Sequence, residues 1–301
     1  TGVSTGNGVG NTYRDWADRF CMYMQYGGTW TLTQESDGPN GFNKSIKALC
    51  TSADDSLGGS DHVVIKYIVE GQDLIRFKKG TADATKFALS FWVKSDEINR
   101  TMVVSLFDSD NTRQIGQSYT THGTTNTWKK IELVFNGETS NAFTYDNNGS
   151  LEIFFFLAAG PDWTSGTLDS DWASYSGGNR AAGQYSLSSA TNNYLQITGV
   201  QLEAADACSE FEYRSYSEEL VRCQRYFDKS FDVAVAPAQN AGRSGAAEFF
   251  AVRTSGNSHS SYFPWSQVMR TTPTITLYNS GNTNSVFRNL DAGSDSSSSG
   301  I

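Results

Sequence analysis

An all-β fold, an antiparallel jelly-roll sandwich, is predicted by two features of this 301-residue sequence. Short runs of β-branched and aromatic residues recur between turns rich in Gly, Asn, Asp and Ser. Several of these runs alternate apolar and polar residues with the period of two that a half-buried strand requires. One helical pattern follows late in the chain. The sequence therefore predicts the sandwich, then one amphipathic helix, then a small C-terminal β region.

The strands of the sandwich are expected between residues 30 and 203. In residues 87–94 the side chains of Phe87, Leu89, Phe91 and Val93 share one face. Residues 151–157 are almost continuously apolar, which is typical of a strand covered on both faces or of one beside a ligand surface. We expect the strand tryptophans Trp92 and Trp128 in the core. The other expected strands are 30–33, 62–69, 102–107, 128–135 and 194–203.

The amphipathic helix is expected over residues 215–229. Tyr216, Leu220, Cys223 and Phe227 form one helical stripe, and Ser215 begins a capping-box pattern. We expect the helix to lie on a sheet and to connect two regions. The predicted domains are a jelly-roll domain at 1–212, a connecting helix at 213–230 and a small β-rich region at 231–301. That last region has expected strands at 249–253, 261–264, 274–278 and 285–287 and a Gly/Ser tail.

Charge and composition exclude several classes of protein. With 23 Lys and Arg against 32 Asp and Glu, the net charge is −9. Binding to nucleic acid or to an anionic membrane surface would call for a basic stripe, so neither is expected. The longest apolar run is far shorter than the roughly 18 residues of a membrane helix. The first residue is Thr1 rather than Met, which is expected of a trimmed or processed chain.

Catalytic and cofactor motifs are not recognisable in the sequence. The four cysteines have no metal-ligand spacing and are expected to be buried thiols. The acidic turns at 54–55, 108–111 and 146–149 offer oxygens for a structural calcium ion, but ordinary Asx turns explain them more simply. Glu132, Glu152 and Glu203 are the candidates for a glycosidase pair. We therefore predict no enzyme activity and no cofactor.

The candidate binding site is an aromatic, glycine-rich loop between two strands. Residues 162–166 and 171–180 hold two tryptophans and a tyrosine among polar residues. Flat rings stack on the C–H faces of sugars, and nearby polar side chains bond to their hydroxyls. Two alternatives are that the loop folds back and buries its own rings, or that it packs against another subunit. The predicted glycan-binding residues are Trp163, Trp172, Tyr175, Asn179 and Arg180.

Seven short sequence segments, taken in their order along the chain, resemble a family of bacteriophage virion proteins, especially tail-fibre and receptor-binding proteins. The similarity spans roughly residues 13 to 278, and residues 199–227 are its most specific part. The layout also resembles jelly-roll carbohydrate-binding modules. The segments are WADRF at 16–20, IVEGQDL at 68–74, LSFWVKS at 89–95, ITGVQLE at 197–203, FEYRSYSEEL at 211–220, CQRYF at 223–227 and VMRTTPTI at 268–275.

This resemblance implies a structural role in the virion and, by analogy of fold, adhesion to a glycan on the host surface. Fibres of this kind are commonly trimers, so a homotrimer with other virion proteins as partners is expected. The glycine-rich residues 1–11 depart from the usual start of the family. The same resemblance fits a capsid (head) decoration or assembly subunit, and the fold alone fits a secreted cellular carbohydrate-binding protein or a passive spacer.

Overall fold

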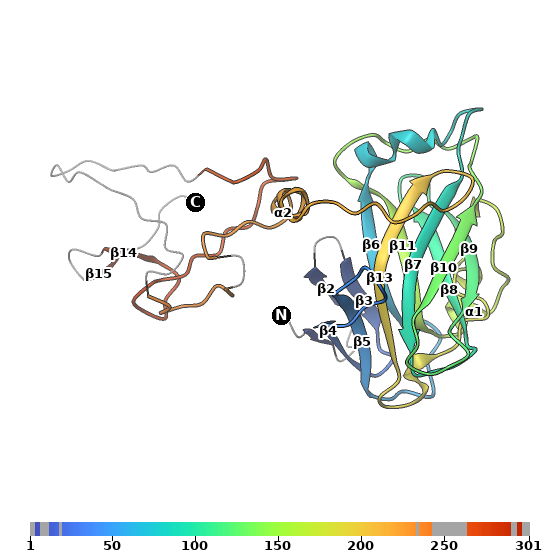
Figure 1. Cartoon of the computed structure of the whole chain (residues 1–301), viewed down its shortest axis with the longest axis horizontal. Coiled ribbons are helices and arrows are strands. Elements are labelled where there is room, and N and C mark those ends of the chain that lie inside the picture. Colours follow the sequence, from blue (N-terminus) through green and yellow to red (C-terminus); the bar gives the residue numbers. More distant parts are fainter. Residues whose placement is uncertain are drawn as a thin grey trace. The chain divides into compact units, whose positions relative to one another are not determined.

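The computed structural model describes residues 4–6, 12–17, 20–232, 235–242, 264–289 and 294–296. The chain divides into two compact units, Thr1–Tyr213 and Arg214–Ile301. Figure 1 shows the strands of both large sheets gathered in the first unit, coloured blue to yellow. The predicted all-β sandwich is confirmed. The three-part domain division stays a prediction.

One sheet of the sandwich has six strands, and every pairing within it is antiparallel. The strand β13 lies at its centre between β5 and β7. In spatial order the strands are β1 (Ser4–Gly6), β4 (Thr29–Glu35), β5 (Ser45–Ser52), β13 (Tyr194–Ala204), β7 (Phe87–Ser95) and β10 (Lys129–Phe135).

The facing sheet has seven strands, also antiparallel throughout. Its central strand β11 is the apolar run noted in the sequence. In spatial order the strands are β12 (Ala173–Ser174), β9 (Arg113–Thr120), β8 (Thr101–Asp108), β11 (Gly149–Ala159), β6 (His62–Glu70), β3 (Phe20–Gln25) and β2 (Thr12–Ala17).

The core lies between the two sheets and follows the period-two pattern. Phe87, Leu89, Phe91 and Val93 of β7 are all buried on the inner face, as predicted. The Phe91 ring meets that of Phe155 on β11 edge to face, with 5.1 Å between ring centroids. Because burial of each such side chain contributes about 1.5–3 kcal/mol, this shared core is the main stabilising feature of the unit.

A second, smaller apolar cluster covers the outer face of the seven-stranded sheet. It contains Val64, Val103, Phe154 and Phe156 from the sheet and Ala181 from the loop that crosses it. Alternate residues of β11 therefore point into two different apolar layers. The apolar run is therefore covered on both faces, as one of its two interpretations predicted.

A buried charge network closes one end of the sandwich, beside the 3-10 helix η1 (Gly71–Phe77). The Lys79 ammonium lies 2.5 Å from Asp108 Oδ2, 2.7 Å from Glu138 Oε2 and 2.5 Å from the Asn141 carbonyl oxygen. Lys79 and Asp108 are fully buried. The other Asp108 oxygen accepts the backbone N–H groups of residues 110 and 111, which confirms an Asx turn there.

The second unit contains the predicted helix, α2 (Tyr216–Gln224). Ser215 and Glu218 form the expected capping box, but the helix ends at Gln224 and none of its nine residues is buried. The packing of its apolar stripe on a sheet stays a prediction. None of the described helices is long and apolar enough to cross a membrane.

The expected C-terminal strands are found only in part. The hairpin of β14 (Phe287–Asn289) and β15 (Ser294–Ser296) overlaps the expected strand at 285–287. Residues 274–278 form no strand, which corrects that expectation. They alternate in sequence, but no described strand pairs with them. The expected strand at 249–253 and most of the one at 261–264 lie outside the described residues.

Candidate functional site

All five predicted glycan-binding residues lie on residues 160–181, which we call the strap. The strap follows β11, contains the short helices α1 (Pro161–Thr164) and η2 (Gly177–Asn179), and pairs with the sheet edge through β12. Its first residue, Gly160, packs so closely on the Gly58 carbonyl that a Cβ would lie 2.0 Å from that oxygen. A glycine is therefore needed where the strap turns back over the sheet.

Trp172 is not available for stacking on a sugar. Its side chain is only 7% exposed and belongs to the core between the sheets. The indole N–H donates to the Asn136 carbonyl at 2.7 Å, and the ring packs beside Phe87 at 5.5 Å. This corrects the prediction of an exposed platform at this position, because the apolar ring and its donor both find partners inside the fold.

Trp163 is half-buried against the outer face of the seven-stranded sheet. Its indole N–H donates to the Ser60 carbonyl at 3.1 Å, and its ring lies 4.5 Å from His62 and 5.9 Å from Phe156. The strap thus folds back and buries its own rings, which is one of the alternatives that the sequence left open. Tyr175, in contrast, is 47% exposed.

Asn179 holds the strap in shape. Its amide N–H donates to Asp169 at 3.0 Å, and its carbonyl oxygen accepts the Thr167 N–H at 3.2 Å. Asp169 also accepts a bond from Gln114 of β9 at 2.6 Å. These bonds tie the strap to the sheet and use one amide N–H and one oxygen lone pair of Asn179. A glycan-binding role for Asn179 and Tyr175 stays a prediction.

Arg180 has the most unusual surroundings of the five residues. It is 4% exposed, and its guanidinium carbon lies 3.9 Å from the centre of the Phe154 ring and 4.8 Å from that of Phe107. Its Nε and Nη2 atoms are buried and have no hydrogen-bond partner. Burial lowers the pKa of Arg180 to about 10, despite the opposing influence of Tyr175 and Glu152. The side chain therefore remains a cation at neutral pH.

Other polar atoms under the strap are also without partners. In the described part of the chain, ten buried side-chain polar atoms lack a hydrogen bond, and five belong to this face of the sheet. Native proteins leave few such atoms. Four of the five lie around Phe154 and Phe107, which pair with Ser105 and Gln114 and lie beneath the Arg180 guanidinium. The five are His62 Nε2, Ser105 Oγ, Gln114 Oε1 and the two nitrogens of Arg180.

Trp92 and Trp128 lie on the outer face of the six-stranded sheet and not in the core, contrary to the expectation. Both side chains are half-buried. Trp92 pairs with Lys130 of β10 and with Thr198 of β13, and Trp128 immediately precedes β10. The sequence held the signal for Trp92: if Phe91 and Val93 face inward, the residue between them must face outward.

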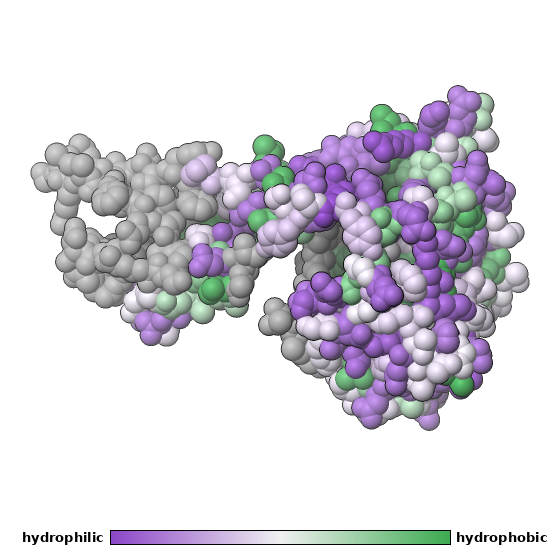
Figure 2. All heavy atoms as spheres, viewed as in Figure 1, coloured by the Kyte–Doolittle hydropathy of each residue, from purple (hydrophilic) through white to green (hydrophobic). Residues whose placement is uncertain are grey.

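The polar side chains beside these rings form a small network. Lys94 forms an ion pair with Asp37, and its ammonium lies 5.3 Å from the centre of the Trp128 ring. Gln196 donates to Asp37 at 3.4 Å. The hydrogen bond from Lys94 lowers the pKa of Asp37. We call Trp92, Trp128, Lys94 and Asp37 the tryptophan surface. Figure 2 shows that hydrophilic residues cover much of the visible face of this unit, with smaller apolar areas between them.

Of the three candidate glycosidase acids, Glu152 is separated from the other two by the sandwich. Glu152 lies on the seven-stranded sheet and bonds to Lys66 at 3.0 Å, whereas Glu132 and Glu203 lie on the six-stranded sheet. Burial raises the pKa of Glu203, but hydrogen bonds from Ser209 outweigh it and the pKa is lowered overall. A general acid needs the opposite shift. Among the described residues, no cluster of acidic, histidine or cysteine side chains could hold a metal ion.

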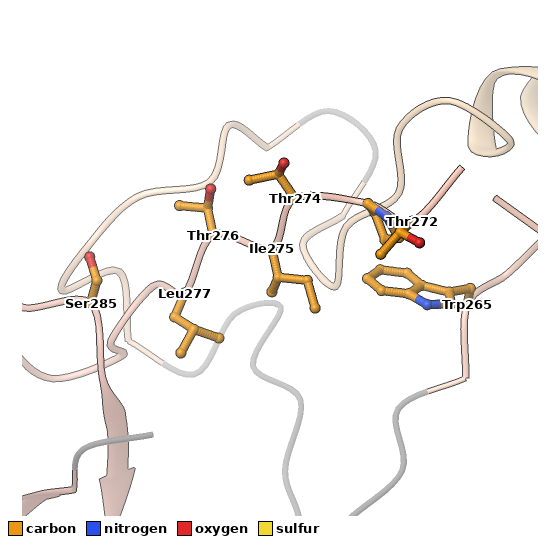
Figure 3. Close-up of a pocket in the computed structure, with 8 residues that line it drawn as sticks. Trp265, Thr272, Thr274, Ile275, Thr276, Leu277 and Ser285 are labelled. Carbon is orange, nitrogen blue, oxygen red and sulfur yellow. The ribbon is translucent and has the colours of Figure 1, made fainter. Parts of the chain in front are cut away.

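A shallow hollow in the second unit is a further candidate. Figure 3 shows Ile275 and Leu277 pointing to the side of the chain where the Trp265 ring lies, with Thr274 and Thr276 pointing away. Its volume is about 620 Å³. The described residues of its lining offer apolar and hydroxyl contacts.

No protein-family model and no curated protein matches the sequence. Among solved structures, the chain is similar to the enzymatically active domain of tailspike protein 4 of bacteriophage CBA120, with 15% identity and a TM-score of 0.33 over 61% of this chain and 19% of that one. It is also similar to the family 11 carbohydrate-binding module of a Clostridium thermocellum cellulase, with 12% identity and a TM-score of 0.34 over 64% of this chain and 95% of the module. A family 61 module solved with β-1,4-galactotriose gives 10% identity and a TM-score of 0.32, over 66% and 99%.

These similarities concern the fold. The chain spans 19% of the tailspike domain and 22% of an α-L-arabinofuranosidase that it also resembles, but almost the whole of the two carbohydrate-binding modules.

Proposed function

We propose that this chain is a non-catalytic bacteriophage virion protein, a tail-fibre or receptor-binding subunit that adheres to a glycan on the host surface. The resemblance of the seven segments between residues 16 and 275 to phage virion proteins supports the virion assignment. The lowered pKa of Glu203 and the separation of Glu152 on the other sheet support a role without catalysis.

The tryptophan surface is the observation that carries the binding role. Two half-buried indole rings lie on one outer face, beside a carboxylate and an ammonium. Rings offer stacking area at low cost in conformational entropy, and the charged groups bond to sugar hydroxyls. The Trp128 side chain also contributes to the lowered pKa of Asp37, so the indole and the carboxylate lie together on this face.

Several copies of the subunit on one particle would strengthen a weak site. A shallow site of this size binds a sugar weakly, and avidity from linked copies raises the effective affinity without any new contact. We therefore include a homotrimer, held together with other virion proteins, in the proposal. Labelling the chain in images of its phage particle tests this placement: label on a fibre agrees with it, and label on the capsid shell favours the decoration role.

Binding of the full chain to an array of bacterial surface glycans tests the adhesion role. We expect Trp92→Ala and Trp128→Ala each to weaken binding at least about tenfold, because an anchoring aromatic residue contributes about 2 kcal/mol. Trp265→Ala is the matched control, since this tryptophan lies in the second unit. Unchanged binding in both sheet variants, or loss only in the Trp265 variant, contradicts the proposed surface, and a chain that binds no glycan contradicts the function.

A further inference from the structure

The two unpartnered nitrogens of Arg180 lie on the same edge of its guanidinium. The Nε–H and one N–H of Nη2 point in the same direction, and this edge forms two parallel bonds to a carboxylate. Both atoms are buried without a hydrogen-bond partner in a side chain that is 4% exposed. The structure thus holds a complete bidentate donor pair with nothing bonded to it.

The sheet below places a hydroxyl group beside this donor pair. The guanidinium lies over the Phe154 ring at 3.9 Å, and Phe154 pairs directly with Ser105 of the neighbouring strand β8. Side chains paired in this way lie about 5 Å apart on the same face. The Ser105 Oγ is buried and also lacks a partner. A ligand oxygen at the Arg180 edge would therefore be close to a second donor.

The charges around Arg180 compensate it only in part. Glu152 is the carboxylate that acts on it, and Glu152 is already bonded to Lys66 at 3.0 Å. Asp169, on the strap, accepts bonds from Gln114 and Asn179. A buried cation without an oxygen partner is costly to a folded protein. A bound monoanion would remove that cost.

One acceptor near Arg180 extends the pattern beyond a bare carboxylate. Gln114 Oε1 is buried without a hydrogen-bond partner, and Gln114 pairs with Phe107, whose ring lies 4.8 Å from the Arg180 guanidinium carbon. The free groups there are therefore a donor pair, a hydroxyl and one acceptor, which suit a ligand with both a carboxylate and a hydroxyl group.

The side chains around Arg180 that reach solvent mark where a ligand would enter. Tyr175 is 47% exposed, and its ring lies 5.9 Å from the guanidinium carbon and 5.9 Å from the Phe107 ring. Phe107 is half-buried, as are Tyr23 and Glu152. These rings offer apolar contact to the C–H faces of a ring-shaped ligand.

We propose that the outer face of the seven-stranded sheet, beneath the strap, is a second binding site that takes a sugar acid, with the carboxylate on Arg180 and Ser105. This site and the tryptophan surface belong to opposite sheets of the sandwich. It goes beyond the proposed adhesion function and does not depend on it.

The test follows the Arg180 Nε–H resonance of the isotope-labelled full chain while D-glucuronate, acetate, methyl glucoside or sulfate is added. We expect glucuronate to shift this resonance at a concentration at least about tenfold lower than acetate, because added charge-neutral hydrogen bonds contribute about 1 kcal/mol each. Methyl glucoside, which lacks the carboxylate, should leave it unmoved. No shift with glucuronate, an equal shift with the glucoside, or a stronger response to sulfate overturns the proposal.

Three variants separate binding from folding. Arg180→Lys should weaken glucuronate binding at least about tenfold, because an ammonium offers no bidentate edge. Ser105→Ala should weaken it several-fold while leaving the fold intact, so the proposal remains testable if the arginine variant fails to fold. Arg100→Lys is the control, since Arg100 also lies over a ring, that of Tyr185 at 4.3 Å, but is bonded to Glu97 and 45% exposed. An equal loss in the Arg100 variant, or no loss in either of the others, contradicts the site.

Discussion

Two buried cations of the first unit, Lys79 and Arg180, have opposite surroundings. The Lys79 ammonium has three oxygens within 2.7 Å, from Asp108, Glu138 and the Asn141 backbone. The Arg180 guanidinium is surrounded by aromatic rings, and two of its nitrogens have no partner. Both cations also lie over rings, Lys79 over Trp172 at 4.9 Å. The oxygens are therefore what distinguishes them.

Lys79 therefore has the surroundings of a charge that stabilises the fold, whereas Arg180 has those of a charge that serves ligand binding. Removing one partner from a satisfied buried network leaves the others unpaired, which is strongly destabilising. Replacing a buried charge that has no partner removes a desolvation cost and leaves nothing unpaired. The two sites should therefore respond in opposite ways to the same chemical change, from a cation to methionine.

The largest expected effect is at Lys79. Lys79→Met leaves the buried Asp108 carboxylate without a cation and Glu138 with Arg113 alone, and it should lower the free energy of unfolding by about 3–5 kcal/mol. Urea denaturation followed by tryptophan fluorescence measures this change.

The neighbouring residue provides the control for that experiment. Lys78 is exposed, so Lys78→Met should change the free energy of unfolding by less than about 0.5 kcal/mol. A small effect at both positions would mean that the Lys79 network does not stabilise the fold. The contrast between Lys79 and Arg180 would then have no energetic basis.

A smaller effect is expected from pH at His62, beneath the strap. Burial lowers the pKa of His62 below its ordinary 6.5, and the charge of Arg180 acts in the same direction against the attraction of Asp61. The unfolded chain therefore binds more protons, and stability is lost as the pH falls below about 6.5, by at most about 1.4 kcal/mol per pH unit.

His62→Gln isolates this contribution, because glutamine does not titrate. We expect the free energy of unfolding of the variant to depend less steeply on pH between 6.5 and 5 than that of the wild type. Identical slopes would show that His62 titrates as it does in the unfolded chain.

Local patterns in the sequence predicted most of the sandwich. The inward face of β7 and the capping box at Ser215 were correct, because period and capping depend on residues that are close in sequence. The same period also places Trp92 outward, which the expectation of a core tryptophan overlooked. Residues 274–278 alternate in the same way but form no strand, and no described strand pairs with them.

The sites could not be predicted in the same way, because they depend on contacts between distant residues. Lys79 meets Asp108 across 29 positions and Asn141 across 62. The loop with the strap residues was correctly identified as unusual, but sequence alone could not show that Trp172 enters the core while Tyr175 stays exposed. Nor could it show that Arg180 would be buried over Phe154 without a hydrogen-bond partner for two nitrogens.

The stability of Arg180→Met tests most directly whether Arg180 is kept for binding rather than for the fold. Methionine fills similar space among the rings of Phe154 and Phe107 and leaves no buried partner unpaired. We predict a free energy of unfolding within about 1 kcal/mol of the wild type, or higher, together with loss of the glucuronate response. A loss of about 3 kcal/mol or more, comparable to that of Lys79→Met, would contradict the account.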